Sequence, residues 1–230
     1  MANKTPRELI VQTLKEKSVV KQDVFKNTIA VFADFKVVLK EIAADLKAKA
    51  AEIDKRLVVD CKDKGEFEIE LRIAGDVLVF YMHTNVFEFD RTHPVWKSSY
   101  VKKQEFNSFC GMINVYNFLN DSFKYNRGQD VGYMIARLFV NREMHYFVEG
   151  KRQLGFLYND FPKAVINKQA IASVVESAVL YCLNFDMFTP PFESVKEVSV
   201  AEILEASNNM QLTTGKRLGF RFLADSDQIE

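Results

Sequence analysis

Near residue 60 the spacing of apolar residues changes from every third or fourth position to every second position. Before this point ten apolar residues fall at helical spacing: Phe25, Ile29, Phe32, Phe35, Leu39, Ile42, Leu46, Ala50, Ile53 and Leu57. After it, charged residues alternate with Phe67, Ile69, Leu71 and Ile73. The first period predicts a helix with one apolar stripe, and the second predicts a strand with one wet and one buried face. The chain should therefore combine a long helix with a sheet.

The N-terminal segment carries the signals of a helix start. Thr5 is suited to cap a helix, Pro6 to occupy its first position, and Glu8 to complete a capping box with Thr5. We expect a short helix from Pro6 to about Lys17.

The long helix, expected from Asp23 to Leu57, would measure roughly 50 Å at 1.5 Å per residue. This is longer than a domain of 230 residues needs to cover one sheet. Two arrangements therefore stay open for its apolar stripe: it bends across the sheet of its own chain, or it forms the seam of a homodimer. The residues of this candidate dimer seam are Phe32, Phe35, Leu39, Ile42 and Leu46.

Strand-like segments fill the middle of the chain. They run over 65–73, 77–89, 112–119 and 131–140, and further strands are expected from His145 and from Leu154. Their short connections favour hairpins and a mainly antiparallel sheet. The row of Glu66, Glu68, Glu70 and Arg72 is expected to be its wet face.

The helical period returns after the sheet. Asn167 is suited to cap a helix with one apolar stripe, formed by Ile171, Val174, Val175, Ala178, Val179 and Cys182. Ser199 and Glu202 indicate another capping box, and 218–224 is strand-like. The fold class is therefore α+β, a mainly antiparallel sheet of five to six strands with a long N-terminal helix and a C-terminal helix packed on one face. Residues 1–60 form a helical segment that is continuous with a sheet domain over 61–230.

Composition excludes several classes of protein. Lys plus Arg and Asp plus Glu both number 31, so no overall field attracts nucleic acid. The three cysteines are widely spaced, which favours a reducing compartment, and no stretch approaches the roughly 20 apolar residues of a membrane span. We expect a cytoplasmic protein without cofactor or membrane contact.

Glu149 and Lys151, within "VEGK", match half of a metal-dependent nuclease signature. The missing acid would be Asp130, Glu68 or Glu70. However, "EGKRQLG" is more typical of a polar hairpin turn. A nuclease, or another nucleic-acid-processing enzyme, is therefore a minor alternative.

His83 and His145 are the candidates for a metal site, because antiparallel neighbours can bring two such residues together. Asp90 or His93 would lie nearby. No ligand spacing of a known type supports this site, so no metal is expected.

The segment 90–106 is the most conspicuous connection and holds the only Trp. Its candidate partner-binding residues are Trp96, Tyr100, Lys102 and Lys103, because aromatic anchors on loops frequently bind partners. Nucleic acid is less favoured, although basic residues are interleaved with tyrosines at Lys102, Lys103, Lys124, Arg127, Arg142, Lys151 and Arg152.

These patterns favour a non-enzymatic cytosolic binding or assembly protein that uses its sheet and the 90–106 loop to hold a protein partner and forms a homodimer. Twenty Phe residues leave a small-ligand domain with an aromatic-lined pocket as the alternative. Nuclease activity comes third.

Overall fold

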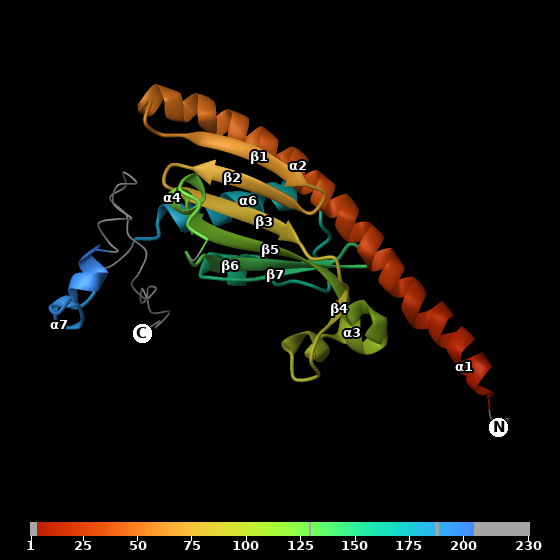
Figure 1. Ribbon diagram of the computed structural model, residues 1–230. Coiled ribbons are helices and arrows are strands. Elements are labelled where there is room, and N and C mark those ends of the chain that lie inside the picture. The colour runs from red at the N-terminus through yellow and green to blue at the C-terminus, as the bar shows by residue number, and fades with distance from the viewer. Residues whose placement is uncertain (1–3, 129, 187–188, 205–230) are drawn as a thin grey trace.

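The computed structural model describes residues 4–128, 130–186 and 189–204. A long helix and a second, shorter helix cover the same face of a mainly antiparallel sheet (Figure 1). The expected α+β class is confirmed, and the described residues form seven strands where five or six were expected.

The N-terminal helical run is continuous where two helices were expected. It consists of α1 (Pro6–Thr13), the π-helical turn η1 (Leu14–Ser18) and α2 (Val19–Ile53). The capping box is confirmed, since Thr5 N donates to Glu8 Oε2 at 2.8 Å and Glu8 N donates to Thr5 Oγ1 at 3.3 Å. The expected break at 18–22 is absent because this stretch contains no Pro or Gly to end a helix.

The sheet has the strand order β1-β2-β3-β5-β6-β7, with β4 paired to β5. Its strands are β1 (Val59–Gly65), β2 (Glu68–Ile73), β3 (Asp76–Met82), β4 (Phe87–Glu88), β5 (Phe109–Leu119), β6 (Tyr133–Asn141) and β7 (Tyr146–Gly150). All pairings are antiparallel.

Strand β1 was not expected, because its sequence "VDCKDKG" lacks apolar alternation. Charged residues suit its position at the edge of the sheet, where they oppose pairing with other chains. Asp63 on this strand accepts from Lys36 Nζ at 2.7 Å and from Lys40 Nζ at 3.1 Å. The hydrogen bond from Lys36 is the main cause that lowers the pKa of Asp63 to about 2.

Two other expectations about strands were wrong. The strand expected over 77–89 ends at Met82, and the chain returns to the sheet as β4. The segment from Leu154 is a short helix, α5 (Gln153–Leu157), because five apolar-rich residues do not distinguish a strand from a helix. The free edge of β7 is bonded by irregular chain instead. Tyr146 N donates to the carbonyl oxygen of Ala164, and Val148 N donates to that of Tyr158.

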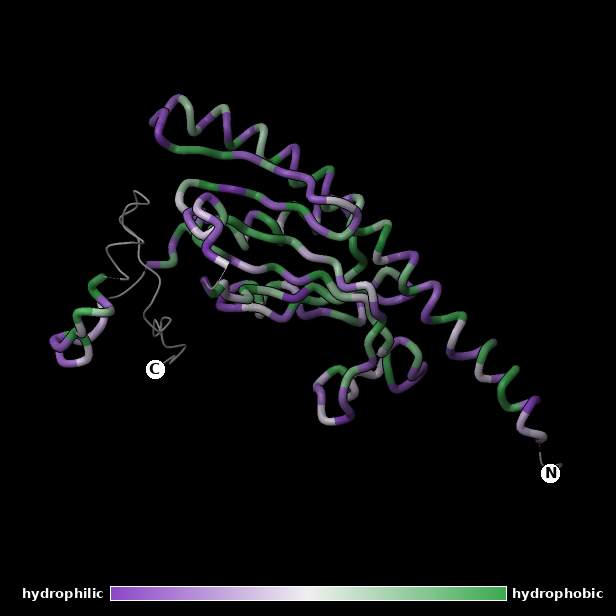
Figure 2. The backbone as a smooth tube through the Cα atoms, in the orientation of Figure 1, coloured by the Kyte–Doolittle hydropathy of each residue, from purple (hydrophilic) through white to green (hydrophobic). Residues whose placement is uncertain are grey.

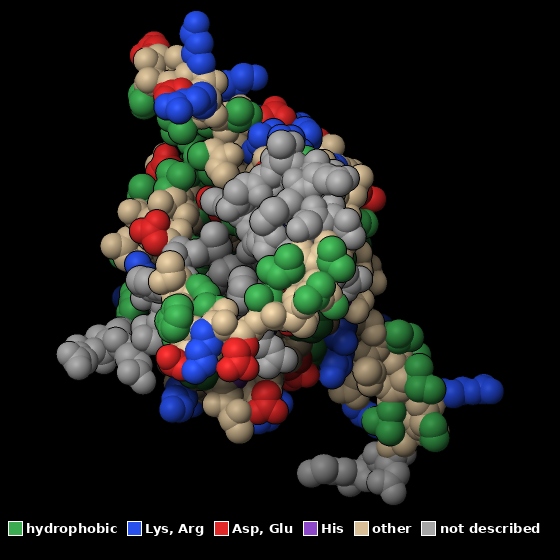
Figure 3. Space-filling view, turned by 60° about the vertical axis from the view of Figure 1, so that its left-hand side comes forward, with side chains coloured by type: hydrophobic (Ala, Val, Ile, Leu, Met, Phe, Trp, Pro, Cys, Tyr) green, Lys and Arg blue, Asp and Glu red, His purple; other side chains and the backbone are tan. Residues whose placement is uncertain are grey.

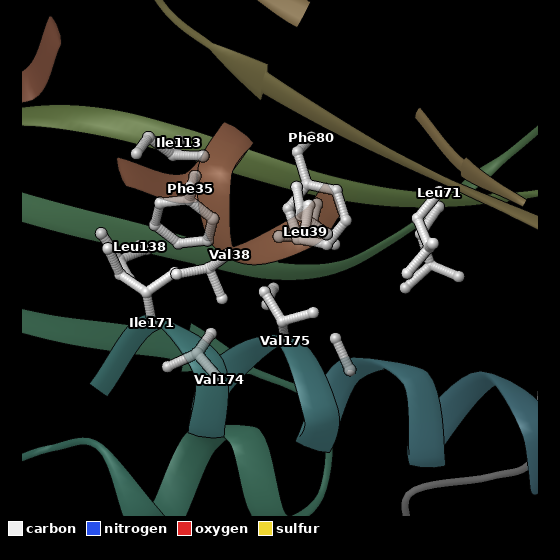
Figure 4. Close-up of a cluster of buried hydrophobic side chains, with 14 of the residues drawn as sticks. Phe35, Val38, Leu39, Leu71, Phe80, Ile113, Leu138, Ile171, Val174 and Val175 are labelled. Carbon is white, nitrogen blue, oxygen red and sulfur yellow. The ribbon is translucent and has the colours of Figure 1, made fainter. Parts of the chain in front are cut away.

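The core fills the space between the sheet, α2 and the C-terminal helix α6 (Lys168–Leu183) (Figure 4). Asn167 caps α6 as expected, with Ala170 N donating to Asn167 Oδ1 at 2.8 Å. All six residues of the expected α6 stripe are buried. Two shorter helical segments are α4 (Asn120–Lys124) and α7 (Phe192–Val195).

The candidate dimer seam lies within its own chain. Phe32, Phe35 and Leu39 are buried in the core between the sheet and α6, and Ile42 and Leu46 pack against its margin. The stripe is therefore covered by the same chain, which is the other arrangement that the spacing left open.

Hydrophobic residues nevertheless continue along α1, beyond the sheet (Figure 2). The capping box of Ser199 and Glu202 is present, with Glu202 N donating to Ser199 Oγ at 3.1 Å. The strand-like segment 218–224 lies outside the described residues.

Candidate partner-binding face of the sheet

The sheet has an outer face, opposite α2 and α6. Because side chains alternate along a strand, the residues between the core positions point to this face. Its members include Asp60, Lys62 and Lys64 of β1, Glu68, Glu70 and Arg72 of β2, Val77, Val79 and Tyr81 of β3, Met112, Asn114, Tyr116 and Phe118 of β5, Met134, Arg137 and Phe139 of β6, and Phe147 and Glu149 of β7.

The row of charged residues on β2 that was expected to be exposed to solvent lies on this outer face, but not all of its side chains are exposed. Glu70 is 7% exposed, because β1 adds a strand beside it. Lys64 Nζ lies 3.2 Å from Glu70 Oε1, so this carboxylate is paired within the sheet.

A polar row crosses the middle of the outer face. The strand register places Glu68, Tyr81, Asn114, Arg137 and Glu149 side by side on β2, β3, β5, β6 and β7. No single segment of the sequence contains this row, since the five residues come from five strands.

Glu149, on β7, is the last residue of the row, and two side chains contact its carboxylate. Arg137 Nη2 donates to Glu149 Oε2, and His93 Nε2 lies 2.8 Å from Glu149 Oε1. The Arg137 guanidinium also lies over the ring of Phe139, 5.5 Å from its centroid. The Glu149 carboxylate is thus a structural bridge between β6, β7 and the segment that contains His93.

The nuclease residues are not brought together. Lys151 lies exposed in the turn after β7, and both carboxylate oxygens of Glu149 are already bonded. Glu68 and Glu70 lie on β2, four strand spacings from β7, which is about 19 Å. Asp130 accepts from Ser122 Oγ at 2.7 Å. Within the described parts of the chain, no three His, Cys, Asp or Glu residues are grouped to hold a metal ion.

The two candidate metal ligands also lie apart. His83 follows β3 and its Nδ1 accepts from Asn85 N at 3.0 Å. His145 precedes β7, and its Nδ1 lies 2.9 Å from the carbonyl oxygen of Phe161. Strands β5 and β6 separate them in the sheet, so they share no site.

The segment 90–108 folds into three short helical turns, η2 (Pro94–Lys97), α3 (Ser99–Lys103) and η3 (Glu105–Ser108). Val95 and Val101 are buried against one end of the outer face, in a cluster with Cys110, Phe139, Phe147 and Phe161. The rings of Phe139 and Phe147 stack with centroids 5.0 Å apart. These aromatic residues pack on each other as a second, smaller core.

Trp96 and Tyr100 are held by their own chain. Trp96 Nε1 donates to the carbonyl oxygen of Phe89 at 3.1 Å, and the Arg91 guanidinium lies 3.8 Å from the centroid of the indole. Tyr100 Oη donates to Glu143 Oε2 at 2.6 Å, and burial together with this bond raises the pKa of Tyr100. Lys102 and Lys103 are exposed.

Trp96→Ala should therefore destabilise the fold by about 2–3 kcal/mol, because it removes a partly buried aromatic side chain. A tryptophan that only anchored a partner from the surface would lose less folding free energy on this substitution. Urea unfolding followed by circular dichroism measures the change. Trp96→Phe is the matched control, since it keeps a ring but loses the hydrogen bond to Phe89. A loss below about 0.5 kcal/mol for the alanine variant would contradict the packing role.

Four of the basic residues that were considered for nucleic acid lie at opposite ends of one strand. Lys102 and Lys103 precede the start of β5, whereas Lys124 and Arg127 follow its end. An 11-residue strand spans about 36 Å. These two pairs are therefore separated by the length of β5.

The outer face carries two features that the sequence reasoning missed. Tyr81 and Met134 are 36% and 39% exposed on its central strands. Asn114 Oδ1 and Arg72 Nε are buried without a hydrogen-bond partner. A period of two along β5, in which Met112, Asn114, Tyr116 and Phe118 alternate with core residues, was the available signal.

Comparison of the chain with protein families, with curated proteins and with solved structures found no match. None of the helices in the described ranges is both long and apolar enough to cross a membrane.

Proposed function

We propose that this protein is a non-enzymatic binding or assembly protein that holds a protein partner on the outer face of its sheet. The observation that carries this proposal is the composition of the central strands. Tyr, Met and Arg are enriched in the cores of protein interfaces, and Tyr81, Tyr116, Met134 and Arg137 lie together here.

Charge favours a protein over a polyanion as the ligand. Two of the four cations of the face are paired with acids, Lys64 with Glu70 and Arg137 with Glu149. Nucleic acid binding depends on cations that are free to neutralise phosphates. A partner surface with charges of both signs matches this arrangement better.

Buried polar atoms support the same conclusion. A buried polar atom without a partner destabilises a protein by about 1–3 kcal/mol. Arg72 Nε is a donor and Asn114 Oδ1 is an acceptor, and both lie on this face. Small shifts of these side chains on binding would let a partner satisfy them.

The segment 90–108 has a supporting role in this proposal. It closes one end of the outer face through Val95 and Val101, and His93 orients Glu149. Lys102 and Lys103 are the exposed residues of the segment that remain candidates for contact at the rim.

Photocrosslinking tests the proposal. A photoreactive phenylalanine analogue is placed at Tyr81 or at Met134, and the crosslinked protein is identified from cells that make this chain. Phe156 is the control position, because it is 73% exposed and lies on α5 rather than on the outer face.

We expect a partner that crosslinks at positions 81 and 134 but not at 156. Met134→Glu should weaken its binding at least tenfold, about 1.4 kcal/mol, without unfolding the protein. Phe156→Glu should leave binding unchanged. Equal crosslinking at all three positions would refute the outer face as the binding surface.

A further inference from the structure

The N-terminal end of the long helix is exposed although it is rich in apolar residues. Leu9, Ile10, Val11, Leu14 and Val19 are each between 49% and 59% exposed. No residue of α1 is buried. Figure 1 shows α1 projecting past the sheet, and Figure 3 shows hydrophobic side chains gathered on this projection, at the lower right.

Three of these residues form one stripe. Ile10 and Val11 lie four and three residues before Leu14, so the three side chains share a face of the helix. An apolar stripe on a surface helix normally packs against the core of its own protein or against another molecule. Here the described part of the chain supplies no cover for it.

The charges beside the stripe match those of a second copy of the same helix. Glu8 and Lys15 are seven residues apart and therefore lie on the same flank of the stripe. In an antiparallel helix pair related by a two-fold axis, each flank faces the same flank of the other helix. Glu8 of each copy then meets Lys15 of the other, which gives two attractive pairs. In a parallel pair Glu8 would instead face the opposite flank, near Thr13.

We propose that α1 and η1 together, residues 6–18, form a dimerisation helix that packs antiparallel against the same segment of a second copy of this chain. Both chains use the same surface for this contact, so the assembly stops at a dimer. The proposed contact uses none of the residues of the outer face, so a failed dimerisation test would leave the partner-binding proposal standing. A single pair of helices buries less than about 800 Å² per partner, so the dissociation constant should be about 1–100 µM.

Sedimentation velocity of the full chain from about 1 to 500 µM tests the proposal across the range expected for a small interface. We expect a reversible increase from 26.5 kDa to twice this mass. Leu14→Glu should raise the dissociation constant at least tenfold while the fold is retained. Ile53→Glu is the matched control at the other end of the same helical run, where the side chain is 77% exposed, and it should still dimerise.

Charge reversal tests the antiparallel direction. Glu8→Lys and Lys15→Glu should each weaken the dimer several-fold, and an equimolar mixture of the two variants should restore it, because both pairs are again attractive. Glu8→Gln serves as a control that keeps the capping box. Failure of the mixture to recover would refute the antiparallel pairing.

Two further outcomes would overturn the proposal. One is a wild-type monomer at every concentration, and binding of that monomer to phosphatidylglycerol vesicles, lost in Leu14→Glu, would then assign the stripe to a lipid surface. The other is a dimer that is unchanged by Leu14→Glu, which would place the contact elsewhere.

Discussion

Leu39→Glu should unfold this protein. Leu39 is completely buried, and it lies among Phe80, Phe35 and Val38 in the core between the sheet and the two long helices (Figure 4). Loss of the leucine packing removes about 2–5 kcal/mol, and an unpaired carboxylate in the core adds several more. The sum approaches the 5–15 kcal/mol that typically stabilises a whole domain.

Far-UV circular dichroism and gel filtration measure this result. Val37→Glu is the matched control, since Val37 precedes Leu39 on the same helix by two residues and is 40% exposed. We expect this control to fold, with a loss below about 1 kcal/mol. A folded, monomeric Leu39→Glu protein would mean that the stripe faces a second chain, as in the dimer-seam hypothesis.

Gly111→Ala should destabilise the fold by about 3 kcal/mol, because it overpacks the contact between α2 and β5. A β-carbon at Gly111 would lie 1.9 Å from Thr28 Oγ1 and 2.7 Å from Thr28 Cβ. Thr28 is buried, and its hydroxyl donates to the carbonyl oxygen of Val24 at 2.7 Å, so the side chain has little freedom to move. Either the helix or the strand must shift.

A double-mutant cycle in urea unfolding checks this reason. Thr28→Ala should rescue Gly111→Ala only in part, because Thr28 Cβ itself lies too close. Thr28→Gly removes that atom and should rescue more, less the roughly 1 kcal/mol that glycine loses in a helix. Gly128→Ala is the control, since a β-carbon there meets nothing within 4 Å. Additive effects of positions 28 and 111 would contradict the steric explanation.

The dimer seam shows how far a helical stripe can be interpreted from spacing alone. The period of Phe32, Phe35 and Leu39 predicts that one side of the helix is covered, and this is correct. It does not say whether the cover comes from the same chain. Here β-strands that lie 20 or more residues further along the chain provide it, together with α6.

Several structural features of this protein depend only on residues that lie close together in the sequence. The capping boxes at Thr5 and Ser199, the cap at Asn167 and the stripe of α6 were all predictable, because each depends on residues within a few turns of one helix. The antiparallel hairpins followed in the same way from alternation and short connections. The α+β class could therefore be derived from the sequence.

Tertiary structure alone decided the features that depend on pairing between distant strands. Strand β1 is charged, and it forms where β2 and α2 lie beside it. The apolar run after Leu154 forms a helix, although its composition suits a strand. The polar row from Glu68 to Glu149 is set by the register of five strands, which shifts at a bulge between β5 and β6. Register is a long-range property, since a slip of one residue moves every side chain of a strand to the other face.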